Sequence, residues 1–282
     1  MPRRSLVVVG ASSTMLLTAC YFTTSFDGLS SGGATASDGG SGTDATGADA
    51  STDASSDAKT DAAADAGEPC VVPGLTTRMC DAFERTTPQG SWASETTTNG
   101  GKIEISEDTT TNSRVFHCRV PALDTSLAQA YLRHETSIGQ RLRFEGDLRY
   151  TPGVTDNARQ LLNFDIGGAG TIYVLMFVAT AQGFAFYEQI DPGLPAVRTK
   201  VHLLKTPVAP GAWHRLTLDV DLLTNKATVL VDGNAALPAT EAFDLLPEFK
   251  GSELGIKLGP SYSANPSTAM DVYFDNVVIA TD

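Results

Sequence analysis

The stretch that decides the fold is Trp213–Gly233, WHRLTLDVDLLTNKATVLVDG. Over Leu216–Leu222, apolar and polar residues alternate strictly, which is the pattern of a β-strand that is buried on one face only. Thr224-Asn225 can reverse the chain because asparagine tolerates a left-handed backbone, and a β-branched run, Ala227–Val231, follows the reversal. The stretch therefore predicts a β-hairpin.

Most of the chain after residue 70 has the same character. Arg141–Tyr150 alternates apolar with charged or small residues as cleanly as the hairpin does. Thr171–Val178 is so evenly apolar that we expect it to be covered on both faces, near the middle of a sheet. The other expected strands are Met79–Glu84, Gly100–Glu107, Arg114–Val120, Tyr131–Glu135, Leu161–Ile166, Phe184–Gln189, Lys200–Leu204, Gly255–Leu258 and Asp271–Ala280. About a dozen short strands without a convincing helix predict an all-β fold, a jelly-roll β-sandwich.

A segment that we do not expect to fold precedes these strands. Residues 20–69 are dominated by Ser, Gly, Thr, Ala and Asp, and nine acidic residues stand against one lysine between residues 21 and 69. Such a chain cannot bury enough apolar surface to offset the entropy lost on ordering it. We therefore expect a disordered acidic linker over 20–69 and a single folded domain over 70–282.

Residues 1–19 have the form of a targeting segment. Arg3 and Arg4 make its start positive, and Leu6–Leu17 is mostly apolar but shorter than the roughly 20 residues that span a membrane. Leu17-Thr18-Ala19-Cys20 resembles the lipobox of bacterial lipoproteins, in which the cysteine becomes the lipidated N-terminus after cleavage. The resemblance implies a signal peptide over 1–19, a membrane anchor on Cys20, and a place at the bacterial outer membrane or cell surface. The alternative is an ordinary secretory peptide.

Charge and cysteine content narrow the partners further. The net charge is −13, and the tail after residue 20 and the domain are both acidic, so a phosphate backbone would be repelled and nucleic acid is not an expected partner. In an oxidising compartment, Cys70, Cys80 and Cys118 can supply one disulfide. We favour Cys80 with Cys118 because both lie on expected strands, and Cys70 with Cys80 is the competing pair.

Two stretches resemble a known group of domains. The hairpin Trp213–Gly233 and the terminal Tyr273–Ile279, YFDNVVI, are similar to strands of laminin G-like and concanavalin A-like sandwiches, including laminarinase-like glucanases and related non-catalytic lectin domains. The resemblance covers roughly residues 80–282. In such relatives an aspartate at the position of Asp275 often ligates structural calcium together with an acid of the first strand. It thus implies Ca²⁺ bound by Asp275, Asp81 and Glu84, and the alternative is that Asp275 only makes hydrogen bonds at a sheet edge.

The sequence does not predict catalytic residues. Laminarinase-like hydrolases carry Glu, Asp and Glu at alternate positions of one strand, and the one approach to this is Glu145-Gly146-Asp147-Leu148-Arg149. Arg149 stands where the second glutamate is needed. Together with Arg143, these residues predict a face of ion pairs with alternating sign. The Arg, Gln-x-His and Tyr-rich strands of alginate lyase-like sandwiches are not found either.

Binding is therefore the favoured function. The resemblance implies a concave sheet on which aromatic rings stack on sugars while a few polar groups fix their orientation. The expected ligand-binding residues are Tyr131, Arg133, Tyr173 and Tyr187, whereas Trp92 and Trp213 are expected in the core. The expected partner is a polysaccharide or glycan, bound without catalysis. The alternatives are a structural or adhesive module that binds an envelope protein, and a divergent glycoside hydrolase or polysaccharide lyase.

Overall fold

A computed structural model describes residues 70–123, 127–151, 158–168, 171–180, 183–191, 198–205, 207–237, 243–245, 251–264 and 268–282. The expected signal peptide, Cys20 and the acidic linker lie outside these ranges. All regular elements of the described ranges are β-strands, which confirms the predicted all-β class. Over the same ranges, no helix is long and apolar enough to cross a membrane.

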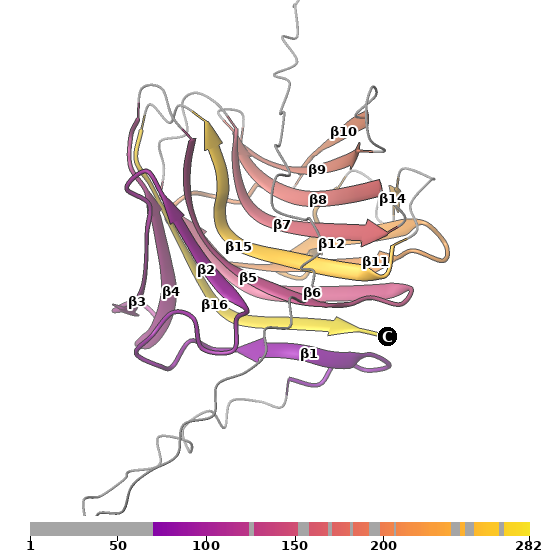
Figure 1. Cartoon of the computed structure of the whole chain (residues 1–282), viewed down its shortest axis with the longest axis horizontal. Coiled ribbons are helices and arrows are strands. Elements are labelled where there is room, and N and C mark those ends of the chain that lie inside the picture. Colours follow the sequence, from indigo (N-terminus) through magenta and orange to yellow (C-terminus); the bar gives the residue numbers. More distant parts are fainter. Residues whose placement is uncertain are drawn as a thin grey trace, which may run out of the picture. The chain divides into compact units, whose positions relative to one another are not determined.

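The strands form two antiparallel sheets that enclose one core (Figure 1). Sheet A has the order β13 (Asn234–Ala235), β12 (Lys226–Val231), β11 (His214–Asp221), β6 (Arg141–Tyr150), β16 (Met270–Thr281), β4 (Ser113–Val120) and β3 (Lys102–Asp108), with β1 (Thr76–Asp81) paired to β16 and β14 (Phe243–Asp244) paired to β12. Sheet B has the order β10 (Arg198–Leu203), β9 (Gly183–Asp191), β8 (Thr171–Thr180), β7 (Arg159–Gly168), β15 (Glu253–Ala264), β5 (Leu127–Ser137) and β2 (Ser94–Thr98). Each sheet combines a run of consecutive strands, β10 to β7 or β13 to β11, with strands from distant parts of the chain, such as β15 beside β5 and β16 beside β6.

The predicted hairpin is formed by β11 and β12. Leu216, Leu218 and Val220 are buried in the core, as their alternation indicated. Asn225, in the turn between the two strands, has a φ of 59°, which is the left-handed backbone expected at this reversal. Local sequence was sufficient here because the turn residue and the alternation specify the same register.

Strand β8 is covered on both faces, also as predicted. Its inward side chains Tyr173, Leu175 and Phe177 belong to the main core between the sheets. The alternate side chains Val174, Met176 and Val178 form a second buried cluster on the opposite face of sheet B. Three further side chains pack against that cluster, namely Ala158, Ile172 and Tyr187.

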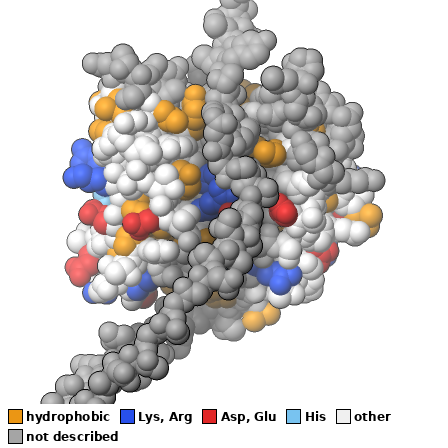
Figure 2. Space-filling view, viewed as in Figure 1, with side chains coloured by type: hydrophobic (Ala, Val, Ile, Leu, Met, Phe, Trp, Pro, Cys, Tyr) orange, Lys and Arg blue, Asp and Glu red, His pale blue; other side chains and the backbone are white. Residues whose placement is uncertain are grey.

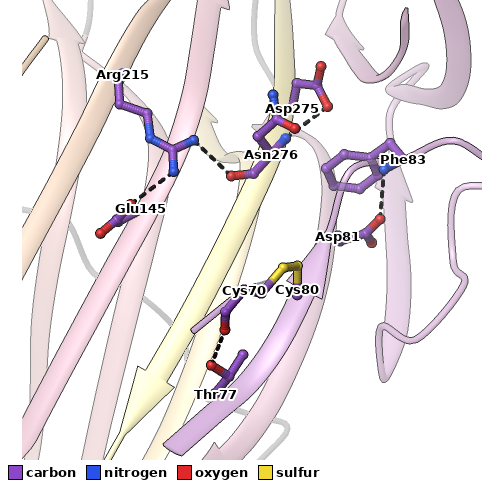
Figure 3. Close-up of a disulfide and its surroundings, with 9 residues drawn as sticks. All are labelled: Cys70, Thr77, Cys80, Asp81, Phe83, Glu145, Arg215, Asp275 and Asn276. Carbon is purple, nitrogen blue, oxygen red and sulfur yellow. Dashed lines mark hydrogen bonds and ion pairs between the residues drawn. A yellow bond between two sulfur atoms is a disulfide. The ribbon is translucent and has the colours of Figure 1, made fainter. Parts of the chain in front are cut away.

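The favoured disulfide was wrong, because the structure joins Cys70 to Cys80 (Figure 3). Cys80 is exposed on β1, and its strand neighbour Met79 turns inward. Cys118 on β4 is fully buried in the core as a free thiol, so Cys80 and Cys118 point to opposite faces of sheet A. The observed bridge, together with a hydrogen bond from the Thr77 hydroxyl to the Cys70 carbonyl, fixes the start of the domain to β1.

Candidate functional site

The outer face of sheet B, which is the surface turned away from the core, is the candidate functional site. One row of side chains crosses it from edge to edge. The row has one residue from each strand of sheet B, in the order from β2 at one edge to β10 at the other: Ser94, Arg133, Lys257, Asn163, Met176, Tyr187 and Val201. Because the register places these residues opposite one another, the face has a polar half on β2, β5, β15 and β7 and an apolar half on β8, β9 and β10.

Two ion pairs organise the polar half. Lys257 Nζ lies 2.7 Å from Asp165 Oδ2, and Arg133 Nε lies 2.8 Å from Glu135 Oε1. Gly255 stands between the two acidic residues in the register. A Cβ at this position would lie 3.6 Å from Arg133 Nη2, so the absence of a side chain leaves that space on β15 unfilled. Basic and acidic side chains are also interspersed over the described part of the surface shown in Figure 2.

Beside these charges, on β7 and the neighbouring strands, lies a layer of neutral polar groups. Asn163 is only 4% exposed, and its Nδ2 donates to Gln160 Oε1 at 2.8 Å. The Ser261 hydroxyl donates to the same Gln160 oxygen at 3.3 Å, and Gln129 Nε2 donates to the Ser261 carbonyl at 2.8 Å. Asn163 Oδ1 has no hydrogen-bond partner although it is buried. This layer therefore offers an unused acceptor at the centre of the face.

The apolar half begins directly beside Asn163. Met176 is the neighbour of Asn163 on β8, and Tyr187 is the neighbour of Met176 on β9. The Tyr187 ring packs on the Met176 cluster, and burial raises the pKa of its phenol. An aromatic ring next to aliphatic side chains and a polar layer can contact a molecule that is apolar on one side and polar on another.

Three of the four predicted ligand-binding residues lie on this face. Tyr131 and Arg133 of β5 alternate with the core residue Leu132, and Tyr187 lies on β9 as described. The prediction for Tyr173 was wrong. Its side chain is fully buried between the sheets, where its hydroxyl donates to Glu188 Oε2 at 2.6 Å.

The outer face of sheet A carries the predicted ion pairs. Arg143 contacts Glu145 at 2.6 Å and Asp219 at 3.1 Å, while Arg215 contacts Glu145 at 2.9 Å and Asp147 at 3.3 Å. Burial opposes ionisation of Glu145, but hydrogen bonds from Arg215 and Arg143 outweigh it and lower the pKa of this carboxyl. Glu145 and Asp147 are thus engaged in a charge network, as the alternating sequence indicated. Figure 3 shows the contact between Glu145 and Arg215.

A hollow of about 270 Å³ lies beside this network, next to an irregularity of β16 between Asp275 and Val278. Its lining residues are Glu84, Thr111, Ser113, Asp147, Trp213, Asp275 and Asn276. Asp275 is 5% exposed and accepts hydrogen bonds from the Ser113 hydroxyl and the Asn276 amide. Burial, and to a smaller extent the nearby charges of Asp147 and Glu84, raise the pKa of Asp275 to about 6.

The expected calcium ligands are only partly brought together. Glu84 and Asp275 line the same hollow, whereas Asp81 belongs to a separate network (Figure 3). Asp81 accepts hydrogen bonds from the Phe83 amide at 2.9 Å and Trp92 Nε1 at 2.7 Å, and it pairs with Arg85. Within the part of the chain that the structure describes, no three His, Cys, Asp or Glu residues are arranged to hold a metal ion. Calcium at the hollow stays a prediction with two of its three proposed ligands in place.

Trp213 is a residue whose place the sequence did not reveal. It is half-buried at the hollow rather than in the core, unlike Trp92, which is 2% exposed. The Arg149 guanidinium lies 4.9 Å from the Trp213 ring centre and 4.3 Å from that of Tyr273. The Trp213 indole also donates to Asp108 at 2.8 Å, and these contacts across three strands have no local sequence signal.

The described chain is thus a jelly-roll β-sandwich with a half-polar, half-apolar outer face on sheet B. Its sequence matches no protein-family model and no curated protein. Among solved structures it is similar to a protein named "Cellulose induced protein, Cip1", with a TM-score of 0.52 and 11% identity over 72% of this chain and 97% of the other. This likeness concerns the fold.

Two further solved structures are similar at lower scores. A carbohydrate esterase of the Shiga toxin-encoding bacteriophage phi24B has a TM-score of 0.48 and 14% identity, covering 74% of this chain and 100% of the other. The family 7 alginate lyase A1-II′ has a TM-score of 0.46 and 12% identity, covering 63% of this chain and 83% of the other.

Proposed function

We propose that the protein is a lipoprotein tethered at the cell surface, whose sandwich binds a carbohydrate on the outer face of sheet B without transforming it. The observation that carries this proposal is the division of that face. Asn163, with an acceptor that has no partner, lies between the charged pair Arg133 and Lys257 on one side and the Met176 and Tyr187 side chains on the other.

Sugars suit such a surface because their chemistry is divided in the same way. The C–H groups of a pyranose ring pack on aromatic and aliphatic side chains, and its hydroxyl groups bind amides, carboxylates and basic side chains at the ring's edge. On this protein the half-buried Tyr187 ring supplies the apolar contact, while Asn163, Asp165 and Lys257 supply polar groups within the neighbouring strands.

Binding without catalysis is favoured by the state of the acids on this face. A glycosidase needs two carboxyl groups, one of which holds a proton for the leaving group. Two acids of the face, Asp165 and Glu135, are each engaged by a basic side chain at 2.7 and 2.8 Å. The Glu145–Asp147 strand lies in the other sheet and is bound by Arg143 and Arg215.

The tether in this proposal rests on the sequence. Cys20 follows the lipobox-like residues, and the acidic chain over 20–69 contains too little apolar sequence to fold. A flexible chain of this length extends over roughly 40 Å, at about 5–6 Å times the square root of its length. Such a spacer would hold the domain clear of the membrane surface, where it can reach a glycan.

Screening the full chain, purified in detergent, against a glycan array tests the proposed function. We expect binding to at least one glycan class, and Tyr187→Ala to weaken it by about tenfold through loss of ring contact. Tyr273→Ala is the matched control, because Tyr273 is an equally half-buried tyrosine on the outer face of sheet A. Failure of the unmodified protein to bind any glycan, or loss of binding in the control alone, would overturn the proposal.

A further inference from the structure

We propose that the glycan bound on the outer face of sheet B is acidic, and that a sugar carboxylate binds between Arg133 and Lys257. This inference rests on the proposed function and names the chemical class of its ligand. It starts from the register, which places Arg133 and Lys257 directly opposite each other on the neighbouring strands β5 and β15.

Two like charges opposite each other destabilise an antiparallel pair. Both side chains lie on the same face, and both are largely withdrawn from water, with side-chain exposures of 26% for Arg133 and 19% for Lys257. On the outer face of sheet A the arrangement differs, since Arg143 and Arg215 each contact two carboxylates. On sheet B, by contrast, Arg133 and Lys257 each contact one carboxylate.

The carboxylates of these two ion pairs differ in their exposure to water. Asp165 is 18% exposed and binds Lys257, but Glu135, which pairs with Arg133, is 60% exposed. An ion pair with so exposed a partner is weakened by water and salt. In addition, Arg133 Nε is buried and does not meet hydrogen-bond geometry toward any acceptor, although Glu135 is close. The shielded part of the face thus has two cations and one carboxylate, and the second carboxylate is exposed.

Asn163 adds a second requirement next to the first. Its Oδ1 atom is buried without a donor, on the strand that flanks Lys257 opposite to Arg133. A ligand that satisfies both sites must present an anionic acceptor toward Arg133 and Lys257 and a hydroxyl donor toward Asn163. A sugar acid carries both groups on one ring.

The spacing fits such a ring. Neighbouring strands are about 4.8 Å apart, so the rows of Arg133 and Asn163 are separated by roughly 10 Å with Lys257 between them. A carboxylated pyranose has similar dimensions when its substituents are included, and the half-buried Tyr187 ring lies further along the same row. Gly255 leaves the space over β15 open for it.

The test uses matched polymers and the full chain in detergent. The probes are polygalacturonate, polymannuronate and polyglucuronate, each beside its carboxyl-reduced counterpart, which differs only in the charged group. We expect at least one acidic polymer to bind tenfold or more tightly than its reduced form, and its affinity to fall as NaCl rises. Arg133→Gln and Lys257→Gln should each weaken this binding about tenfold or more.

Arg119→Gln is the matched control, because Arg119 is a basic side chain on the outer face of sheet A, and its expected effect is none. Equal binding of acidic and reduced polymers, or undiminished binding by Arg133→Gln and Lys257→Gln with melting temperatures like that of the parent, would overturn the inference while leaving carbohydrate binding in place. Binding of no carbohydrate at all would overturn the proposed function as well.

Discussion

Replacing Asp275 by asparagine should make the protein more stable at alkaline pH. Asp275 is almost fully buried beside the hollow on sheet A, and the hydrogen bonds that it accepts from Ser113 and Asn276 do not compensate for its desolvation. Asparagine keeps the shape and one acceptor oxygen, and it cannot ionise. The substitution therefore isolates the free energy of holding a negative charge at this position.

The magnitude follows from the pKa of Asp275, which is raised from 3.8 to about 6 in the folded protein. The contribution of its neutral carboxyl to stability is fully present below pH 3.8 and is lost as the pH rises through about 6. At 1.36 kcal/mol for each unit, the loss is on the order of 3 kcal/mol above pH 7. Asp275→Asn does not lose it, so the gap in unfolding free energy between variant and parent should widen by that amount between pH 3.5 and pH 8.

Urea unfolding of both proteins at these two pH values measures the gap. Glu107→Gln serves as the control, because Glu107 is an exposed acid on β3, and its gap should not change with pH. The reasoning is refuted if the gap for Asp275→Asn is the same at pH 3.5 and pH 8. The same titration at pH 8 with added Ca²⁺ or a chelator tests the calcium prediction, since an ion held by Asp275 and Glu84 would stabilise the parent and not the variant.

Three further outcomes are expected. Cys70→Ser should lower the free energy of unfolding by about 2–3 kcal/mol in urea titrations, because the bridge to Cys80 closes a short loop; an unchanged midpoint would contradict a structural bridge. In the parent protein, Cys118 should react with a thiol reagent only after unfolding, since the thiol is buried and burial raises its pKa. Cells fed labelled palmitate should incorporate it into the parent and not into Cys20→Ser, and equal labelling would refute the lipid anchor.

The strands could be predicted because their signal is local. Arg141–Tyr150 was expected as one strand and is observed as β6 with the same bounds. The alternation of apolar and polar residues in this strand is a property of the strand's own sequence and does not depend on its neighbours. In the hairpin of β11 and β12, the turn residue also fixes the register. Strand pairing between distant segments has no such signal, so the order within the sheets came only from the structure.

The same limit explains the errors at the site. Tyr173 lies in an almost entirely apolar strand, so alternation gave no indication of which face its ring occupies, whereas Arg133 is marked as outward by its charge. Cys80 and Cys118 were judged by being on strands, yet a disulfide also requires both to point to the same side. The place of Asn163 in the site could not be predicted from local sequence, because its neighbours Lys257 and Met176 lie on other strands.

The contrast between the two outer faces is the strongest reason to assign binding to sheet B. Arg143 and Arg215 on sheet A are each satisfied by two carboxylates, so a ligand there would have to displace existing contacts. On sheet B, Asn163 Oδ1 is buried without a hydrogen bond, and such a group costs about 1–3 kcal/mol. A ligand that donates a hydrogen bond to Asn163 Oδ1 removes that cost, so binding at this face should raise the melting temperature, and Asn163→Ala should reduce the rise.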